Sequence, residues 1–235
     1  MKERQKVLIA MPCIRGELKV FTALSILGTV AECHNAGISA QLRAWVGDSI
    51  LPSARNILFG MFYEDKSLTD LVFWDDDICC PEGSLTKLLS YPVDFVGGTY
   101  RIKKEEIEFP LKTLPGERHS TDPVTGLLQV AGVPTGFMRI TRAAADKLVE
   151  AYKDLEYDPQ KEGAPKRVWC LFDWPFRPGK GLYGEDWGFC EKWTAIGGKV
   201  WLDPKMRLSH VGIKEYGPAS LHEHLSTQGK VQEAA

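Results

Sequence analysis

Apolar and polar residues follow two different patterns along the first hundred residues. Short apolar runs without polar alternation predict strands that are buried on both faces, as in a parallel sheet covered by helices. Between these runs, apolar residues recur every three or four positions, which predicts helices with one apolar face. Strands are predicted over residues 6–11, 39–46, 71–75 and 94–98, and helices over residues 17–36, 53–63 and the segment after Pro81. This order predicts an α/β fold with a doubly wound, mostly parallel sheet in a single domain.

The regular alternation ends near residue 100. Residues 101–126 and 153–184 combine proline with polar, glycine or tryptophan residues, and long irregular segments inside a domain are usually functional loops. Further strands are predicted over residues 127–133, 136–140, 199–202 and 206–210, and helices over residues 141–152 and 185–196. We expect residues 1–212 to form the domain and residues 213–235 to form a polar C-terminal tail.

Length, charge and cysteine spacing narrow the class of protein. A chain of 235 residues is long enough for one large α/β domain with a full core. The net charge of −2, without a basic run, does not favour electrostatic binding to nucleic acid. No segment approaches the ~20 apolar residues of a membrane-spanning helix, and the N-terminus lacks the pattern of a secretory signal. The six cysteines lack zinc-type spacing and predict reduced thiols in a cytoplasmic protein.

The most informative motif is a triplet of carboxylates, Asp75, Asp76 and Asp77, directly after an apolar run. Ligands of open α/β sheets bind outside the carboxyl ends of the strands. Asp75 and Asp77 are two residues apart, so they point the same way along an extended backbone. Two oxygen ligands on one side suit a divalent cation such as Mg²⁺ or Mn²⁺. The alternative is that Asp77 lies near the start of the next helix, where the helix dipole favours a negative charge. One acid would suffice for that role, and three are present.

Two further acids, Glu185 and Asp186, open the helix predicted over residues 185–196. On their own they fit an ordinary acidic helix N-terminus, in which Asp186 acts as a cap. Their position after a long loop rich in tryptophan and glycine favours a functional site instead.

Arg55 and His210 are the remaining candidates. Arg55 lies near the start of a predicted helix, where a cation opposes the helix dipole, so we expect it to have a partner such as a phosphate or one of the aspartates. A solvated arginine is the alternative.

His210 ends a short apolar strand and is by default a structural residue. If that strand ends near Asp77, two carboxylates and one imidazole would suit Mn²⁺. The cations within residues 100–104 lie near the same sheet edge, but a charge run is more often a solvated face.

Taken in order, these motifs resemble the nucleotide-sugar-dependent glycosyltransferases of the GT-A fold, and in particular small bacterial and viral domains of that kind. The resemblance covers about residues 1–212. Its shared elements lie at residues 53–56, 72–78, 96–100, 135–138, 184–190, 201–204 and 210–212. The D-x-D triplet alone is a weak signal, and the ordered set is a stronger one.

The resemblance implies roles for these residues. Asp75 and Asp77 would be the D-x-D acids, with Asp77 on the metal and Asp75 on the ribose or a metal-bound water. His210 would complete the metal site. The implied nucleotide-binding residues are Arg55, Asp75, Asp76 and Pro12, and the implied metal ligands are Asp75, Asp77 and His210. The implied cofactor is Mn²⁺ or Mg²⁺, and the implied donor is a UDP- or GDP-sugar.

Asp186 would match the catalytic base of inverting members, with Glu185 as the alternative, because an acceptor hydroxyl must lose its proton during attack. In a retaining enzyme Asp186 would only orient the sugar. The acceptor would be a glycan, a lipid-linked molecule or a small molecule. Two other classes stay open. One is a metal-dependent nucleotidyltransferase or phosphohydrolase, which the lack of a phosphate-binding glycine motif disfavours. The other is a non-catalytic nucleotide-sugar binder or partner-binding module.

Overall fold

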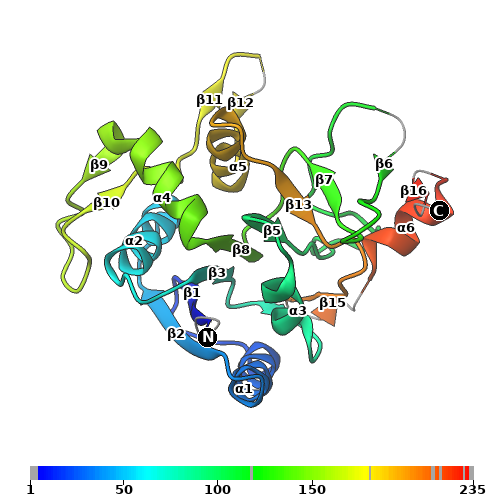
Figure 1. Cartoon of the computed structure of the whole chain (residues 1–235), viewed down its shortest axis with the longest axis horizontal. Coiled ribbons are helices and arrows are strands. Elements are labelled where there is room, and N and C mark those ends of the chain that lie inside the picture. Colours follow the sequence, from blue (N-terminus) through cyan, green and yellow to red (C-terminus); the bar gives the residue numbers. More distant parts are fainter. Residues whose placement is uncertain are drawn as a thin grey trace.

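Seven strands form one central sheet (Figure 1). The computed structural model describes residues 5–116, 119–179, 181–212, 215–216, 219–229 and 231–232. The order of strands across the sheet is β2 (Ser39–Val46), β1 (Lys6–Cys13), β3 (Asp70–Trp74), β8 (Phe137–Thr141), β5 (Phe95–Gly97), β13 (Val200–Leu202) and β7 (Leu128–Val130). Only β8 and β7 run against the direction of the other described strands in this sheet. The prediction of a doubly wound, mostly parallel α/β sheet is confirmed.

Helices cover both faces of this sheet (Figure 1). The helices are α1 (Val20–Asn35), α2 (Leu51–Glu64), α3 (Ser84–Ser90), α4 (Arg142–Ala151), α5 (Glu185–Ala195) and α6 (Leu221–Thr227). Side chains of α2, α4 and α5 join one buried cluster, and side chains of α1 and α3 join a second cluster on the other face. Among the described residues, every helix is too short or too polar to cross a bilayer.

Strand β3 shows why the apolar runs lack alternation. Leu71 and Phe73 belong to the cluster on the α2 face, whereas Val72 and Trp74 belong to the cluster on the α1 face. All four side chains are fully buried. Because a strand points successive side chains to opposite faces, a strand covered on both faces must be apolar at every position.

In their described residues, the two regions predicted to be irregular contain only short elements, which are β6 (His119–Ser120), β9 (Glu156–Tyr157), β10 (Val168–Trp169), β11 (Phe176–Arg177), β12 (Gly181–Leu182) and a 3₁₀ turn at Lys153–Leu155. Further short strands lie outside these regions, namely β4 (Ile78–Cys79), β14 (Ser209–Val211), β15 (Glu215–Tyr216) and β16 (Val231–Gln232). One of their pairings positions the site. β14 pairs antiparallel with β4, which places His210 opposite Ile78. The strand that carries His210 therefore ends beside the carboxylate triplet.

Two local expectations are corrected. The first strand, predicted to end at residue 11, continues through Pro12 to Cys13. β3 pairs with β1 only as far as Ala10, so among the described strands Pro12 has a neighbour on one side only, which is β2. A proline is tolerated at such a position because its missing N–H is not needed for a second strand. The second correction concerns α1, whose apolar residues Phe21 and Leu24 are 59% and 60% exposed. Its inward face carries Thr22, Ile26, Thr29 and Cys33 instead.

The segment expected as a tail contains ordered structure. Ser220 caps α6 by accepting a hydrogen bond from the Glu223 N–H, and Leu221 and Leu225 are buried in the main cluster. Residues 213–214, 217–218, 230 and 233–235 of that segment lie outside the described residues. The domain boundary at residue 212 therefore stays a prediction.

A buried ion pair joins β3 to β8 and gives a test of the sheet. Arg139 Nε lies 2.7 Å from Asp70 Oδ1, and both side chains are nearly inaccessible. Replacing Arg139 by Met would leave the Asp70 charge buried without its partner, so we expect the free energy of unfolding to fall by about 3–5 kcal/mol. Urea denaturation measures this change.

The matched control is Arg167→Met. Arg167 forms an exposed pair with Glu156, and such pairs contribute less than about 1 kcal/mol. Similar losses in both variants would show that the Asp70–Arg139 pair is not a stabilising link between these strands.

Candidate functional site

The site lies at the carboxyl end of β3, where four separate segments meet. β3 ends directly before Asp75, α2 carries Arg55 in its N-terminal half, α5 begins at Glu185, and β14 carries His210. Two groups of ion pairs are formed there, one around Arg55 and one around Asp77. Three of the carboxylates that the sequence singled out, Asp75, Asp77 and Glu185, are thus paired with a cation contributed by another part of the fold.

Arg55 bridges two carboxylates from different elements. Its Nε lies 3.2 Å from Glu185 Oε1, and its Nη2 lies 3.0 Å from Asp75 Oδ1 and donates a hydrogen bond to Oδ2 at 3.2 Å. The arginine is only 1% exposed. Burial disfavours the charged guanidinium, but the charges of Asp75 and Glu185 outweigh this and raise the pKa of Arg55 above its usual value. The expectation that Arg55 pairs with an aspartate is confirmed.

This buried network contains unused hydrogen-bonding capacity. Arg55 Nη1 is buried and has no hydrogen-bond partner within the described part of the chain. Asp75 Oδ1 also makes no hydrogen bond there, although Arg55 Nη2 lies 3.0 Å from it in the ion pair. Buried polar groups in folded proteins are almost always satisfied, so the unmatched Nη1 donor indicates a place for a bound group. Arg55 and Asp75 are both predicted to contact a nucleotide.

Asp77 forms the second group. Its Oδ2 lies 2.5 Å from Lys103 Nζ and 3.3 Å from His210 Nε2. Burial alone would raise the pKa of Asp77, but the hydrogen bonds from His210 and Lys103 outweigh burial and hold that pKa below its usual range. On the other side of the ring, His210 Nδ1 lies 3.0 Å from the carbonyl oxygen of Arg101. Because a carbonyl only accepts, Nδ1 is the nitrogen that carries a proton.

Asp186 differs from its neighbour Glu185. Glu185 is held by Arg55, whereas Asp186 Oδ1 accepts a hydrogen bond from the backbone N–H of Trp187 at 2.8 Å. Burial raises the pKa of Asp186 to about 6, and the Glu185 charge adds to the rise. Gly184 makes room for this carboxylate, since a Cβ at that position would lie 2.5 Å from Asp186 Oδ1. A carboxylate whose pKa lies near neutrality is suited to accept a proton.

Tyr100 lies among these groups. It is buried and its ring packs edge-on against the His210 ring, with 4.9 Å between centroids. Burial raises the pKa of Tyr100 far above its usual value, and the charges of Asp75, Asp77 and Asp186 raise it further. Gly136 is required beside it, because a Cβ there would collide with the phenol oxygen. Tyr100 thus keeps a neutral hydroxyl between the two groups of ion pairs.

Two adjoining hollows flank the triplet. One, of about 300 Å³, is lined by Pro12, Asp48, Leu51 and all three aspartates. The other, of about 440 Å³, is lined by Arg15, Lys19, Asp77, Lys103 and Val211, together with Asp76. Burial raises the pKa of Asp76, while a hydrogen bond with Cys13 lowers it. Asp76 and Pro12, both predicted to bind a nucleotide, therefore face open space at the end of β1.

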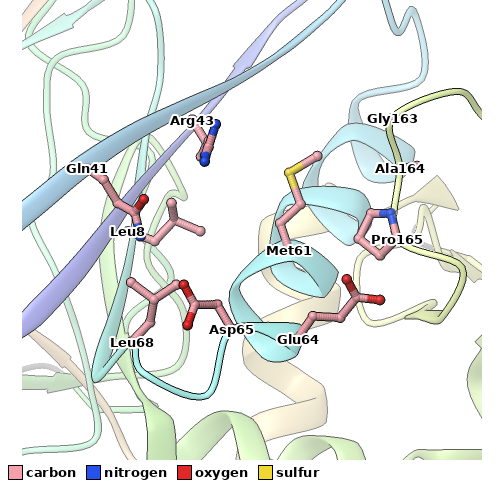
Figure 2. Close-up of a pocket in the computed structure, with 10 residues that line it drawn as sticks. All are labelled: Leu8, Gln41, Arg43, Met61, Glu64, Asp65, Leu68, Gly163, Ala164 and Pro165. Atoms are coloured by element: carbon pink, nitrogen blue, oxygen red, sulfur yellow. The ribbon is translucent and has the colours of Figure 1, made fainter.

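A larger hollow lies elsewhere on the molecule. It has a volume of about 460 Å³ and lies between β2, the end of α2 and residues 163–165 (Figure 2). Figure 2 shows Arg43, Glu64 and Asp65 around it, with the apolar Met61 and Pro165 between them. None of the residues predicted for the site lines this hollow. We therefore place the candidate site at the triplet and not here.

The structure brings the predicted residues into two contacting sets and one adjacent acid. Arg55, Asp75 and Glu185 form the first set, and Asp77 and His210 form the second. Asp186 follows Glu185 at the start of α5 without an ion pair among the described residues. The roles assigned to these residues stay predictions.

Sequence reasoning missed Lys103 and Tyr100. The charge run from Tyr100 to Lys104 predicts a solvated face, and this holds for Lys104, which pairs with Glu108 at the surface. It does not hold for Lys103, which reaches Asp77. The available signal was position, because the run follows the end of β5 and therefore lies at the same sheet edge as the triplet.

Asp77 and His210 fit a divalent cation in their chemistry. Carboxylate oxygen and imidazole nitrogen are both ligands of Mn²⁺, and the Nδ1 contact with Arg101 orients the ring as in many metal sites. Within the described ranges, however, no three His, Cys, Asp or Glu side chains already form a ligand set. Asp75, the third predicted ligand, contacts Arg55. A cation held at Asp77 and His210 would therefore need further oxygen ligands from water or phosphate.

No family model matches the sequence, and no curated protein matches it. Solved structures do match. The crystal structure of A197 from STIV gives a TM-score of 0.51 at 16% identity, over 88% of this chain and 86% of that chain. The catalytic domain of Drosophila β1,4-galactosyltransferase 7, in complex with xylobiose, gives 0.46 at 12% identity, over 85% of this chain and 65% of that chain.

A third solved structure is a glycosyltransferase involved in the glycosylation of the major capsid of PBCV-1. It gives a TM-score of 0.35 at 10% identity, over 64% of this chain and 67% of that chain. At such low identities the similarity concerns the fold. Together with the sheet order, the similarity to A197 agrees with the prediction of one α/β domain.

The raised pKa of Asp186 predicts an effect on stability. A carboxyl with a folded pKa of about 6 and an ordinary value of 3.8 binds its proton more tightly in the folded state, so ionisation above pH 6 destabilises the fold. Asp186→Asn removes this ionisation. We expect its melting temperature at pH 7.5 to exceed that of the unsubstituted protein by roughly 2–4 °C, the shift that ~1 kcal/mol produces in a domain of this size. The difference should shrink as the pH falls from 6 to 4.

Glu191→Gln, on the same helix, is the matched control. Burial would raise the pKa of Glu191, but ion pairs with Arg177 and Lys112 outweigh this and lower it. This substitution should therefore lower the melting temperature or leave it unchanged. A destabilised Asp186→Asn variant at pH 7.5 would contradict the assignment.

Proposed function

We propose that this chain is a glycosyltransferase that transfers a hexose from a nucleoside diphosphate sugar, such as a UDP- or GDP-sugar, to an acceptor. The acceptor would be a glycan, a lipid-linked molecule or a small molecule. The observation that carries the proposal is the convergence of the carboxylate triplet with Arg55, Asp186 and His210 at one edge of the sheet. The order of these motifs along the chain resembles GT-A glycosyltransferases, and the GT-A-like fold agrees with it.

The donor side of the site is the region around the triplet. The open space beside Pro12 and Asp76 has the dimensions of a small-molecule site and lies outside the carboxyl ends of the strands. Arg55 Nη1 is a buried cationic donor without a partner in the described structure, which suits a phosphate or hydroxyl oxygen. Lys103 adds a second cation on the solvent side. These features support a diphosphate next to the triplet.

A divalent cation would be held by Asp77 and His210, with Asp75 as the further predicted ligand. Bound Mn²⁺ or Mg²⁺ would supply Lewis-acid stabilisation of the negative charge that develops on the leaving diphosphate. Neighbouring groups of the chain prepare Asp77 and His210 to hold this cation. Asp77 is kept ionised by its cationic neighbours, and Arg101 orients the His210 ring through its carbonyl oxygen.

Asp186 is the proposed base for the acceptor. An acceptor hydroxyl is a very weak acid, so a positioned carboxylate must take its proton as the bond to the sugar forms. Glu185 is less suited to this role, because its carboxylate is already bound by Arg55. Asp186 lies at the start of α5, is largely removed from water, and has a pKa of about 6. This assignment applies to transfer with inversion of the anomeric centre.

The first functional test is a product analysis with a panel of nucleotide sugars and Mn²⁺. We expect release of a nucleoside diphosphate, whereas a nucleotidyltransferase would release pyrophosphate and a phosphohydrolase would release phosphate. Asp77→Ala should lower donor turnover roughly 100-fold or more, since it removes the residue at the centre of the cation site. Circular dichroism checks that the fold is retained.

Asp94→Ala is the matched control for this variant. Asp94 precedes β5 at the opposite end of the sheet and contacts Thr141 and Lys147. It should keep turnover near that of the unsubstituted protein. Full turnover in a folded Asp77→Ala variant would reject the metal role, and binding of nucleotide without turnover of any donor would favour a non-catalytic binder.

The second functional test is the pH dependence of transfer. If Asp186 is the base, it must be ionised in the free enzyme, so kcat/KM should rise with pH and level off above an apparent pKa of about 6. Asp186→Asn should lower kcat/KM by roughly 100-fold or more and remove this acidic limb. Transfer within about threefold of the unsubstituted enzyme would exclude Asp186 as the base.

A further inference from the structure

Three groups meet at a single oxygen atom of the site. Asp77 Oδ2 lies 2.5 Å from the ammonium of Lys103 and 3.3 Å from His210 Nε2. Asp77 and His210 are the two residues proposed above to hold a divalent cation. The ammonium therefore already holds a position against the carboxylate oxygen that the cation would use.

The His210 ring is held from both sides. Nδ1 lies 3.0 Å from the Arg101 carbonyl oxygen, and Nε2 lies 3.3 Å from Asp77 Oδ2. This arrangement fixes Nε2 beside the carboxylate oxygen, so one cation could contact both residues. Lys103 is the side chain that places a positive charge against this oxygen in the described structure.

Lys103 is carried by a segment that bonds mainly within itself. The Ile102 N–H donates to the Glu108 carbonyl oxygen at 3.0 Å, Arg101 Nη2 donates to the Glu105 carbonyl oxygen at 2.9 Å, and Lys104 pairs with Glu108. Residues 103–108 are exposed. The Lys103 side chain reaches from this segment across to Asp77, so its position depends on the carboxylate to which it is bound.

We propose that Lys103 is a tethered competitor of the divalent cation. In the empty protein its ammonium neutralises Asp77. A divalent cation that binds Asp77 and His210 displaces it, because two positive charges a few ångströms apart repel each other strongly. Displacement also breaks the direct ion pair between residues 101–108 and the triplet, while the contact of the Arg101 carbonyl oxygen with His210 remains. The inference rests on the proposed function for the identity of the metal position, and it assigns to Lys103 the control of metal uptake.

Titration with Mn²⁺ alone tests the competition, with free Mn²⁺ followed by electron paramagnetic resonance. Lys103→Met keeps the length of the side chain and removes its charge. We expect this variant to bind Mn²⁺ about three- to tenfold more tightly, since it lacks both the competing ion pair and the repulsion. Lys104→Met is the matched control, because Lys104 pairs with Glu108 and should leave the affinity unchanged. Adding Asp77→Asn to Lys103→Met should abolish the gain.

Unchanged or weaker Mn²⁺ binding by Lys103→Met would overturn the proposal, as would the absence of Mn²⁺ binding in every variant. Weaker binding would instead make Lys103 a partner of the metal site. The titration contains no sugar nucleotide, so its outcome is separate from the proposed function. If Lys103→Met binds Mn²⁺ more tightly but the protein transfers no sugar, only the proposed function is overturned. If the protein transfers sugar but Lys103→Met and the unsubstituted protein bind Mn²⁺ equally well, only the competition is overturned.

Limited proteolysis with a glutamate-specific protease tests the release of the segment. Glu105, Glu106 and Glu108 are exposed cleavage sites within it. Mn²⁺ should speed cleavage of the unsubstituted protein several-fold. Lys103→Met should be cleaved at the faster rate with or without Mn²⁺. A cleavage rate that does not respond to Mn²⁺ in the unsubstituted protein would overturn the displacement step.

Discussion

Neutralisation of the negative charge at the end of β3 is the constraint on which the rest of the site depends. The carboxylates gathered there are Asp75, Asp76, Asp77, Glu185 and Asp186. A charge removed from water destabilises a fold by several kcal/mol unless it is paired, so the elements around β3 must supply cations or leave the acids protonated. Arg55 and Lys103 supply the cations, and Asp186, which has no ion pair among the described residues, has a raised pKa of about 6. α2 and the segment after β5 each bring one of these cations to the end of β3.

The two cations differ in how firmly they are held. The Arg55 side chain is 2% exposed and contacts carboxylates from β3 and α5 at once, so it joins two elements and is part of the permanent structure. The Lys103 side chain is 37% exposed and binds one oxygen from a segment that extends into solvent. Water can replace the lysine at a small energetic cost, but it cannot replace the buried guanidinium. A fixed charge and an exchangeable charge on either side of one triplet suit a site that must bind and release a charged ligand.

Much of the fold could be predicted from the sequence because local pattern and tertiary environment agree. The strand predicted over residues 39–46 appears with the predicted bounds. The buried run before the triplet also appears as expected, since a strand covered on both faces has a continuous apolar signal. Pro12 and α1 show where local rules fail. Pro12 is accommodated because of where β3 stops pairing, and α1 turns its apolar residues outward because its polar face bonds to the segment after β4, as in the bond from Ser25 Oγ to the Cys80 carbonyl oxygen.

The sequence by itself determined the order of strands and helices, the placement of the acids at strand and helix ends, and the expectation that Arg55 has an anionic partner. These follow from chain connectivity and from the periodicity of apolar residues, both of which are local. Only the tertiary structure decided which cation meets which acid. Lys103 lies 26 positions from Asp77 along the chain, and His210 reaches it through the pairing of β14 with β4. Such contacts depend on how distant segments pack, and no local pattern contains that information.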